Sequence, residues 1–315
     1  MANLKDIRKR ISSVKSTQKI TRAMKMVAGA RLNRAQQRIL ALRPYAVKTA
    51  SVLSEVTEVY AEIEEGAEND VLQAIEAEQP LLSRRPEKSV LLLVITSDRG
   101  LCGSFNASIN KEAQRAWTKR RAEGQRVQVA VIGRKGRDFV RRRDVEVAHV
   151  FERVWDRLDL EQARVVARTL LRPFLAGEVD AIYMVYNEFK SAMTQRVVVE
   201  PLLPVQRAVD EAKKEKKKEE ERVELSKMDR EFIFEPDRRA LLAHLVPMYV
   251  EISILRALYE SMASELGARM TAMDAATKNA SEMIDKLTLK YNRARQAAIT
   301  TELMEIIGGA NALQE

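Results

Sequence analysis

Few residues of this sequence are of the types that carry out covalent catalysis or bind metal ions. The 315 residues include one cysteine, Cys102, and two histidines, His149 and His244. A cysteine nucleophile needs a base beside it, and a structural zinc site needs four Cys or His ligands. We therefore expect neither a Cys–His pair nor a histidine metal site. A single cysteine also excludes an internal disulfide bond and fits a reducing compartment.

Two glycine-containing loops are the remaining candidates for a ligand site. The first, SDRGLCGSFN at 97–106, follows an apolar run and precedes a predicted helix, where open α/β sheets bind ligands. It lacks the glycine spacing and the lysine of a phosphate-binding loop. The second, Gly133-Arg134-Lys135-Gly136, either accepts an anion at the start of the next helix or is a plain tight turn. We expect the turn. We find no catalytic constellation, and no cofactor is expected.

The loops belong to a region in which strand and helix patterns alternate. Strands are predicted at 89–96, 127–132, 145–150, 181–187 and 195–201, and helices at 107–123, 134–143 and 159–176. The run SVLLLVIT at 89–96 is continuously apolar, as a strand buried on both faces should be. Alternation of this kind predicts a Rossmann-like α/β domain with a largely parallel sheet, to which the strand at 195–201 adds antiparallel at an edge.

A much longer helix follows, from about 238 to 307, interrupted only by Pro247. At 1.5 Å per residue it spans about 100 Å, too long for a globular fold to cover. Apolar and small residues recur in it at spacings of three and four, which form a seam for a partner helix. These residues are Met270, Met273, Thr277, Ala280, Ile284, Leu287, Tyr291, Ala294 and Ala298.

The partner helix is predicted at the N-terminus, over 4–60, with Pro44 as the position of a kink. Its seam begins with Leu4, Ile7, Ile11 and Val14, continues through Gln18, Thr21 and Lys25, and resumes with Ala28, Leu32, Ala35, Ile39 and Leu42. Ile20, Met24 and Val27 fall on the next face. Two core helices of an all-α bundle are the alternative, which the length of the helices disfavours. We predict a long antiparallel intramolecular coiled coil.

The charge of the chain is concentrated at the N-terminus. The formal net charge is +9, and residues 1–60 hold thirteen Lys and Arg against three acidic residues. Three hypotheses account for this: a transit peptide, a DNA-binding basic region, and a solvated or protein-facing coiled-coil surface. The basic residues lie all around the helix without aromatic residues between them, so we expect the third, and no nucleic acid as a partner. The sequence has no run of 18 uncharged apolar residues, so no membrane span is expected.

Changes of composition divide the chain into five segments. An N-terminal coiled-coil helix (1–60) is followed by an acidic connector (61–88), which has room for a short helix at 71–77, and by the α/β domain (89–205). A charged insertion and connector (206–236) contains KKEKKKEEE and a strand-like stretch at 231–234. The C-terminal coiled-coil helix (237–315) completes the chain, with Asp237 as a plausible cap.

Three stretches resemble the gamma subunit of F-type ATP synthase. They are IRKRISSVKSTQKITRAMKMVA near the N-terminus, the loop TSDRGLCGSFN, and ARMTAMDAATKNASEMIDKLTLKYNRARQAAITTELMEIIGGA near the C-terminus. Together they cover both termini and the middle domain. The resemblance implies a central-stalk rotor subunit without a catalytic site of its own. Such a subunit couples proton- or sodium-driven rotation of a membrane ring to ATP synthesis or hydrolysis at the beta subunits.

The resemblance also implies which residues meet the beta subunits. The family's acidic beta loop contacts the shaft at a motif that here contains Met24 and Lys25. Other beta loops grip the C-terminal helix at Arg295, Gln296 and Thr300, with Glu302 beside them. The implied partners are the alpha and beta subunits, the epsilon subunit and the membrane c-ring, with one copy of the chain per complex. The implied location is peripheral, on the cytoplasmic face of the bacterial inner membrane.

The sequence departs from the family in two places. Chloroplast relatives carry a cysteine pair in an inserted segment, and a thiol switch of that kind is excluded here because Cys102 is the only cysteine. The segment 210–230 is longer and more charged than is typical of the family. It is either a tolerated surface insertion, which we expect, or a regulatory or partner-binding element.

Overall fold

The computed structural model describes residues 4–66, 80–83, 85–205 and 238–312. These group into two units: a coiled-coil unit within 1–31 and 269–315, and a sheet unit within 32–268. The two long helices are α1 (Leu4–Gly66) and α7 (Arg238–Ala312), and each contributes residues to both units. The charged insertion, the strand-like stretch at 231–234, the cap at Asp237 and the helix at 71–77 lie outside the described residues. The division into five segments stays a prediction.

The sheet unit is built on a five-stranded sheet in the order β3-β2-β1-β4-β5. Its strands are β1 (Ser89–Ile95), β2 (Arg126–Ile132), β3 (Glu146–Phe151), β4 (Ala181–Phe189) and β5 (Gln195–Leu203). The first four are parallel, and β5 pairs antiparallel with β4 at the edge. The Rossmann-like domain with an antiparallel edge strand is therefore confirmed. The observed strand ends lie within two residues of the predicted ones.

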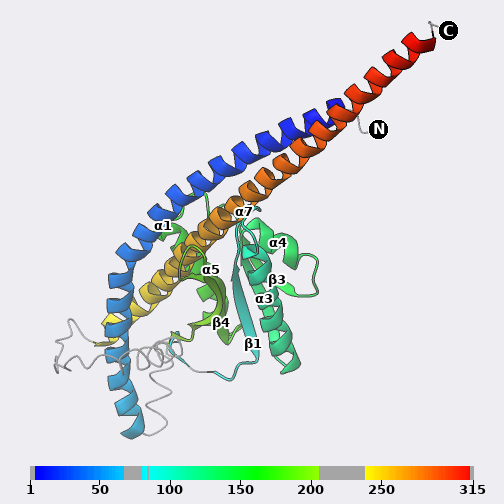
Figure 1. Ribbon diagram of the computed structural model, residues 1–315. Helices are drawn as coiled ribbons and strands as arrows, with labels where there is room; N and C mark the ends of the chain where they lie inside the picture. Colours follow the sequence, from blue (N-terminus) through cyan, green and yellow to red (C-terminus); the bar gives the residue numbers. More distant parts are fainter. Residues whose placement is uncertain (1–3, 67–79, 84, 206–237, 313–315) are drawn as a thin grey trace. The chain divides into compact units, whose positions relative to one another are not determined.

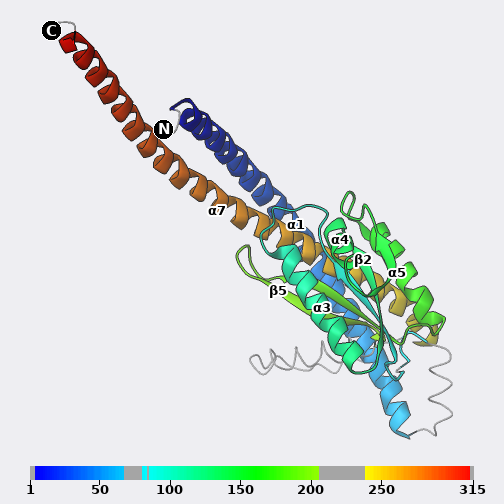
Figure 2. The ribbon, with the colours of Figure 1, turned by 90° about the vertical axis from the view of Figure 1, so that its right-hand side faces the viewer.

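Helices cover both faces of this sheet (Figures 1 and 2). One face packs on α3 (Phe105–Ala122), through Phe105, Ile109 and Trp117, and on the short α4 (Arg134–Val140). The other face packs on α5 (Leu160–Leu175) and on the part of α7 that lies in the sheet unit. Because helices lie on both sides, the central strand β1 is buried along nearly all its length, which explains its uninterrupted apolar sequence.

The part of α7 in the sheet unit is a core helix. Its residues Leu242, Val246, Val250, Ile254 and Leu258 are fully buried, at spacings of four that align one face of a helix with the sheet. Between Ala240 and Ile307 the helix contains a stretch long and apolar enough to cross a membrane by length and composition alone. Of that stretch 56% is buried inside the structure, so packing accounts for its apolar composition. Both Pro247 of α7 and Pro44 of α1 lie inside continuous helix.

The coiled-coil unit pairs the start of α1 with the C-terminal part of α7. Arg8 lies beside Tyr291, Thr21 beside Thr277, and Lys25 beside Asp274. The partner's number falls as the number in α1 rises, so the helices are antiparallel, as predicted. At Gly29 the helices approach closely, because a Cβ atom there would stand 3.4 Å from the Met270 Sδ.

The burial of the coiled-coil seam follows the predicted spacing, with one correction. Ile7, Thr21 and Ala28 of α1 are buried, while Ile20 and Val27 on the next face are more than half exposed. On α7 the seam holds from Met273 to Ala294. The prediction for Ala298 was wrong, because this residue is exposed. At Ala298 the helix α7 already extends beyond the first residues of α1, so no described residue covers Ala298 (Figures 1 and 2).

Candidate functional site

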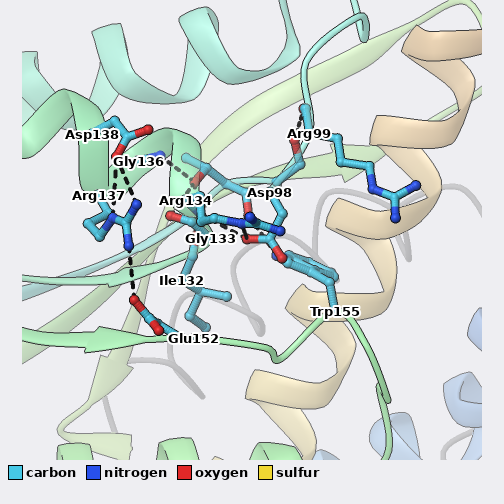
Figure 3. A network of polar contacts seen from close by, with 12 residues as sticks. Asp98, Arg99, Ile132, Gly133, Arg134, Gly136, Arg137, Asp138, Glu152 and Trp155 are labelled. Atoms are coloured by element: carbon cyan, nitrogen blue, oxygen red, sulfur yellow. Dashed lines mark hydrogen bonds and ion pairs between the residues drawn. The ribbon is translucent and has the colours of Figure 1, made fainter.

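The start of α4, after β2, does not offer an anion site, because the chain's own groups occupy its backbone amides (Figure 3). At the start of α4, the Arg134 N–H donates to the Asp98 carboxylate (2.9 Å) and the Lys135 N–H to the Ser97 carbonyl (3.1 Å). The Gly136 N–H donates to the Thr96 hydroxyl (2.8 Å), whose own proton goes to the Ile132 carbonyl. Gly133 directly precedes α4, and Arg134, Lys135 and Gly136 form the first turn of that helix, so the segment is a helix start and not the expected plain tight turn.

Glycine is required at position 133, directly before α4. Gly133 has φ +94°, and a Cβ atom there would stand 2.2 Å from the Thr96 carbonyl oxygen. The Trp155 indole N–H donates to the same oxygen at 2.9 Å (Figure 3). Cys102 is buried, and its Sγ receives a hydrogen bond from the Asn106 amide at 3.2 Å. The hydrogen bonds made by Thr96 and Cys102 hold the loop after β1 in place.

Both histidines are exposed, whereas Cys102 is buried. The His149 ring lies tilted against the Phe151 ring with centroids 4.3 Å apart, and His244 belongs to α7. Across the described stretches of the chain, no three Cys, His, Asp or Glu side chains gather as a metal site would require.

A polar layer inside the coiled coil contains one of the predicted contact residues. The Lys25 ammonium lies 2.6 Å from the Asp274 carboxylate, which also pairs with Lys278 at 3.3 Å. Hydrogen bonds from these two lysines lower the pKa of Asp274 below its ordinary value. One turn away, the Thr21 and Thr277 hydroxyls are 2.8 Å apart. Polar pairs of this kind fix the register of a coiled coil, because a slip of one turn would separate them.

The surface beside this layer is apolar and uncovered. Met26 and Val27 are 64% and 54% exposed, and Met24 is half-buried. The Lys25 side chain keeps 43% of its area in solvent, so it remains open to an acidic group from another protein. Met24 and Lys25 thus lie on a surface where apolar side chains and an accessible cation occur together.

The other four predicted contact residues lie on the unpaired end of α7. Arg295, Gln296, Thr300 and Glu302 are all exposed. The Thr300 hydroxyl donates to the Gln296 carbonyl of its own helix, and the side chains of Arg295 and Gln296 make no hydrogen bond or ion pair to any described residue. Around them, five large apolar side chains are 46% to 66% exposed: Ile299, Leu303, Met304, Ile306 and Ile307. Exposed apolar side chains in such density mark a surface that another protein covers.

The two predicted groups do not meet in one site. Asp274, which binds Lys25, lies 21 positions before Arg295 on the same helix, which is about 30 Å along its axis. The structure therefore presents two separate surfaces on the coiled-coil unit. We call residues 24–27 the collar and residues 295–307 the tip.

A partly buried charge cluster in the sheet unit was not predicted from the sequence. The Arg256 guanidinium of α7 pairs with the Glu200 carboxylate of β5 and donates to the Tyr186 hydroxyl of β4 (3.3 Å). Tyr186 in turn donates to Glu200 at 2.6 Å. Glu260, one turn along α7, lies 3.6 Å from Arg256, and its Oε2 is buried with no described hydrogen-bond partner. Burial raises the pKa of Glu260 to about 7, although the charge of Arg256 opposes this.

One chain thus combines a long antiparallel coiled coil, whose tip exposes apolar side chains, with a Rossmann-like domain, and the exposed tip indicates a subunit of a larger assembly. Comparison with known proteins agrees. The family model described as ATP synthase matches residues 3–313. The chain is 60% identical to the ATP synthase gamma chain of Sorangium cellulosum and 46% identical to that of Geobacter sp. strain M21, over the full length of both proteins in each pair.

Solved structures show the same architecture. A chain in the central stalk and c-ring of Tetrahymena thermophila mitochondrial ATP synthase is 27% identical, with a TM-score of 0.54, over 82% of this chain and 99% of that one. A chain of Euglena gracilis mitochondrial ATP synthase matches in fold at 18% identity and a TM-score of 0.62, over 98% of this chain and 94% of that one. The chain belongs to the gamma chain family of ATP synthases, as the central-stalk rotor subunit.

Proposed function

We propose that one copy of this chain turns inside a ring of alpha and beta subunits and carries no catalytic site of its own. The observation that carries the proposal is the tip, where exposed apolar residues surround Arg295 and Gln296 on a helix without a described partner. An isolated chain gains nothing from exposing this surface to water, whereas a ring of subunits around it would bury it. The backbone amides at the start of α4 support the absence of a phosphate site there, since they are occupied by Asp98, Ser97 and Thr96.

The coupling between rotation and chemistry is mechanical in this proposal. A pair of helices has no threefold symmetry, so three surrounding beta subunits would each face a different side of the shaft. Each side stabilises one conformation of the nucleotide site it faces, and the effect on that site equals the difference in contact free energy between conformations. A difference of about 1.4 kcal/mol changes a conformational equilibrium tenfold. Rotation exchanges the three states among the subunits.

The collar and the tip have different parts in this mechanism. At the collar, an acidic beta loop would share Lys25 with Asp274, which already holds the ammonium in a fixed position. At the tip, Arg295 and Gln296 would bind polar groups of other beta loops, with Thr300 and Glu302 beside them. A guanidinium donates several hydrogen bonds to one carboxylate, and each such bond contributes about 1.5–3 kcal/mol when shielded from water.

The sheet unit would form the base of the rotor. In the proposal it rests on the membrane c-ring and the epsilon subunit, on the cytoplasmic face of the bacterial inner membrane, and transmits rotation driven by protons or sodium ions. The relatives that support this assignment of compartment are bacterial chains such as those of Sorangium cellulosum and Geobacter.

The test is the ATPase rate of the complex reconstituted with Arg295→Ala, alone and with Gln296→Ala. We expect normal folding of the chain and a steady-state rate reduced about tenfold, because the loss of one charge-assisted bond of about 1.5 kcal/mol weakens one angular state more than the others. Assembly yield is measured beside the rate.

Two controls make this result specific. Arg293→Ala removes the same charge two positions away, which places it about 200° around the helix. Ala297→Ser leaves both polar side chains in place. Both should retain the normal rate. A normal ATPase rate with Arg295→Ala would show that other residues make the contact with the beta subunits. A lower assembly yield, with an unchanged rate per assembled complex, would show that Arg295 has a structural role.

A further inference from the structure

Helix α7 is fastened to the β4–β5 hairpin by polar and close backbone contacts, in addition to its apolar core face. The contacts are made by Arg256, Ser264 and Gly267, whose positions, eight and three apart, lie on one face of the helix. The Arg256 guanidinium pairs with the Glu200 carboxylate of β5 and donates to the Tyr186 hydroxyl of β4 at 3.3 Å. We call the contacts of these three α7 residues with the hairpin the joint.

The joint continues from the ion pair to the end of the sheet unit. The buried Ser264 hydroxyl donates to the Asn187 carbonyl of β4 at 3.2 Å. At Gly267, a Cβ atom would stand 3.1 Å from the Ala192 carbonyl oxygen and 3.3 Å from the Ala192 Cα. The turn between β4 and β5 therefore lies directly against the backbone of α7. Gly267 is the last residue but one of α7 in the sheet unit, which ends at Ala268.

This contact explains why a glycine occurs inside the long helix. Glycine is among the least favourable residues in a helix interior, and no other glycine occurs in α7 until the pair close to its end. The turn is braced by its own hydrogen bonds, from the Ser191 N–H to the Thr194 carbonyl and from the Gln195 amide to the Ala192 carbonyl, each at 3.0 Å. A side chain at position 267 would have to displace this braced turn.

Contacts of these kinds oppose rotation of a helix about its own axis, which apolar burial alone does only weakly. The hydrophobic effect depends on buried area and has no preferred direction, whereas a hydrogen bond weakens steeply when its donor turns away from the acceptor. Arg256 and Gly267 are eleven positions apart, which is about 16.5 Å along the helix axis. The joint thus fixes the angle of α7 against the hairpin at two separate levels.

We propose that the joint transmits torque between the sheet unit and the coiled coil, with Arg256 and Gly267 as positioning residues that hold α7 at a fixed angle. This inference rests on the rotation proposed above. Helix α7 continues from the sheet unit into the coiled-coil unit, so a helix that cannot turn against the hairpin passes a rotation of the sheet on to the coiled coil. Without the joint, part of that rotation would be taken up as twist of α7 against the sheet.

The test measures the torsional stiffness of the rotor in assembled complexes whose alpha and beta subunits are fixed to a surface. A bead is attached to α3 through Lys119→Cys, an exposed position, and the variance of its angle is recorded while the rotor pauses. Arg256→Met keeps the helix propensity and the Tyr186–Glu200 bond inside the sheet, but removes both bonds of Arg256 to the hairpin. We expect the variance to increase about twofold, because the bonds lost are charge-assisted and each is about twice as strong as the neutral bond that remains at Ser264.

Two further variants separate positioning from folding. Arg256→Lys should restore the low variance, because an ammonium group at this position can still pair with Glu200. Gly267→Leu should increase the variance although leucine favours a helix, because its side chain displaces the turn at Ala192. Urea unfolding of each isolated chain measures stability beside the stiffness.

The matched control is Arg126→Met, which removes an arginine of the same sheet unit. Arg126 pairs with Glu146 at 3.1 Å, between β2 and β3, and belongs to no contact of the joint. Its variance should equal that of the unaltered complex. An unchanged variance with Arg256→Met, or an equal increase with Arg126→Met, would overturn the proposal while leaving the rotation intact. A bead that never turns on the unaltered complex would overturn the proposed rotation and this inference together.

Discussion

Glu260→Gln should stabilise the sheet unit at neutral and alkaline pH and have little effect in acid. The Glu260 carboxyl has a pKa of about 7 in the folded chain, raised by burial from the usual 4.5. Glutamine has nearly the shape of the protonated acid and never ionises. The substitution therefore removes the cost of keeping a buried carboxylate charged, while Arg256 retains its other partner, Glu200.

The pH dependence of this stabilisation, and its size, follow from proton linkage. Below pH 4.5 the carboxyl is protonated in both states, so its burial costs nothing. Between pH 4.5 and 7 the folded state binds more protons than the unfolded state, so the free energy of unfolding falls as the pH rises. Above pH 7 the full cost is reached. A difference of about 2.5 between the two pKa values corresponds to about 3 kcal/mol. From pH 5 to pH 8 the advantage of the variant should grow by about 2–3 kcal/mol.

The assay is urea unfolding of the full-length chain at pH 5 and pH 8, followed by tryptophan fluorescence. Both tryptophans, Trp117 and Trp155, lie in the sheet unit, so the signal reports the unit that contains Glu260. Glu178→Gln, an exposed position of the same unit, is the control and should shift both curves little and equally. An advantage that does not change with pH, or an unaltered chain more stable than the variant at pH 8, would refute this reasoning.

Two further predictions concern the coiled coil and the turn before α4. Thr21→Cys combined with Thr277→Cys should form a disulfide within one chain on mild oxidation, because the two hydroxyls are 2.8 Å apart. Cys102 is buried and should not interfere. Cross-links found only between chains would indicate an intermolecular zipper instead. Gly133→Ala should lower the free energy of unfolding by at least about 2 kcal/mol, since its Cβ would collide with the Thr96 carbonyl at φ +94°. Gly124→Ala has a similar φ of +82° with open space around it, and should cost only about 1 kcal/mol; equal losses at both positions in urea titrations would remove the collision as the cause.

Periodicity predicted most of this fold because the elements are long or fully buried. The spacing of Ile7, Thr21 and Ala28 identified the α1 seam, including its polar layer, and the uninterrupted apolar run of β1 identified the centre of the sheet. Ala298 was misplaced because a heptad pattern does not tell where the partner helix begins.

The polar clusters were not predictable in the same way. The Arg256–Glu200 pair exists only because β5 adds antiparallel beside β4 and brings a residue of the edge strand under α7. The occupation of the α4 amides by Asp98 depends on the loop after β1, whose course no periodic pattern describes.

The most direct test of the rotor assignment is observation of a single assembled complex. Met193 is 83% exposed in the turn between β4 and β5, and Cys102 is 2% exposed, so the Met193→Cys variant allows one bead to be attached through its new thiol. The alpha and beta subunits are fixed to a surface and ATP is supplied. The account predicts that the bead turns continuously in one direction, with three pauses per revolution. A bead that stays at one angle while the same complexes hydrolyse ATP would contradict it.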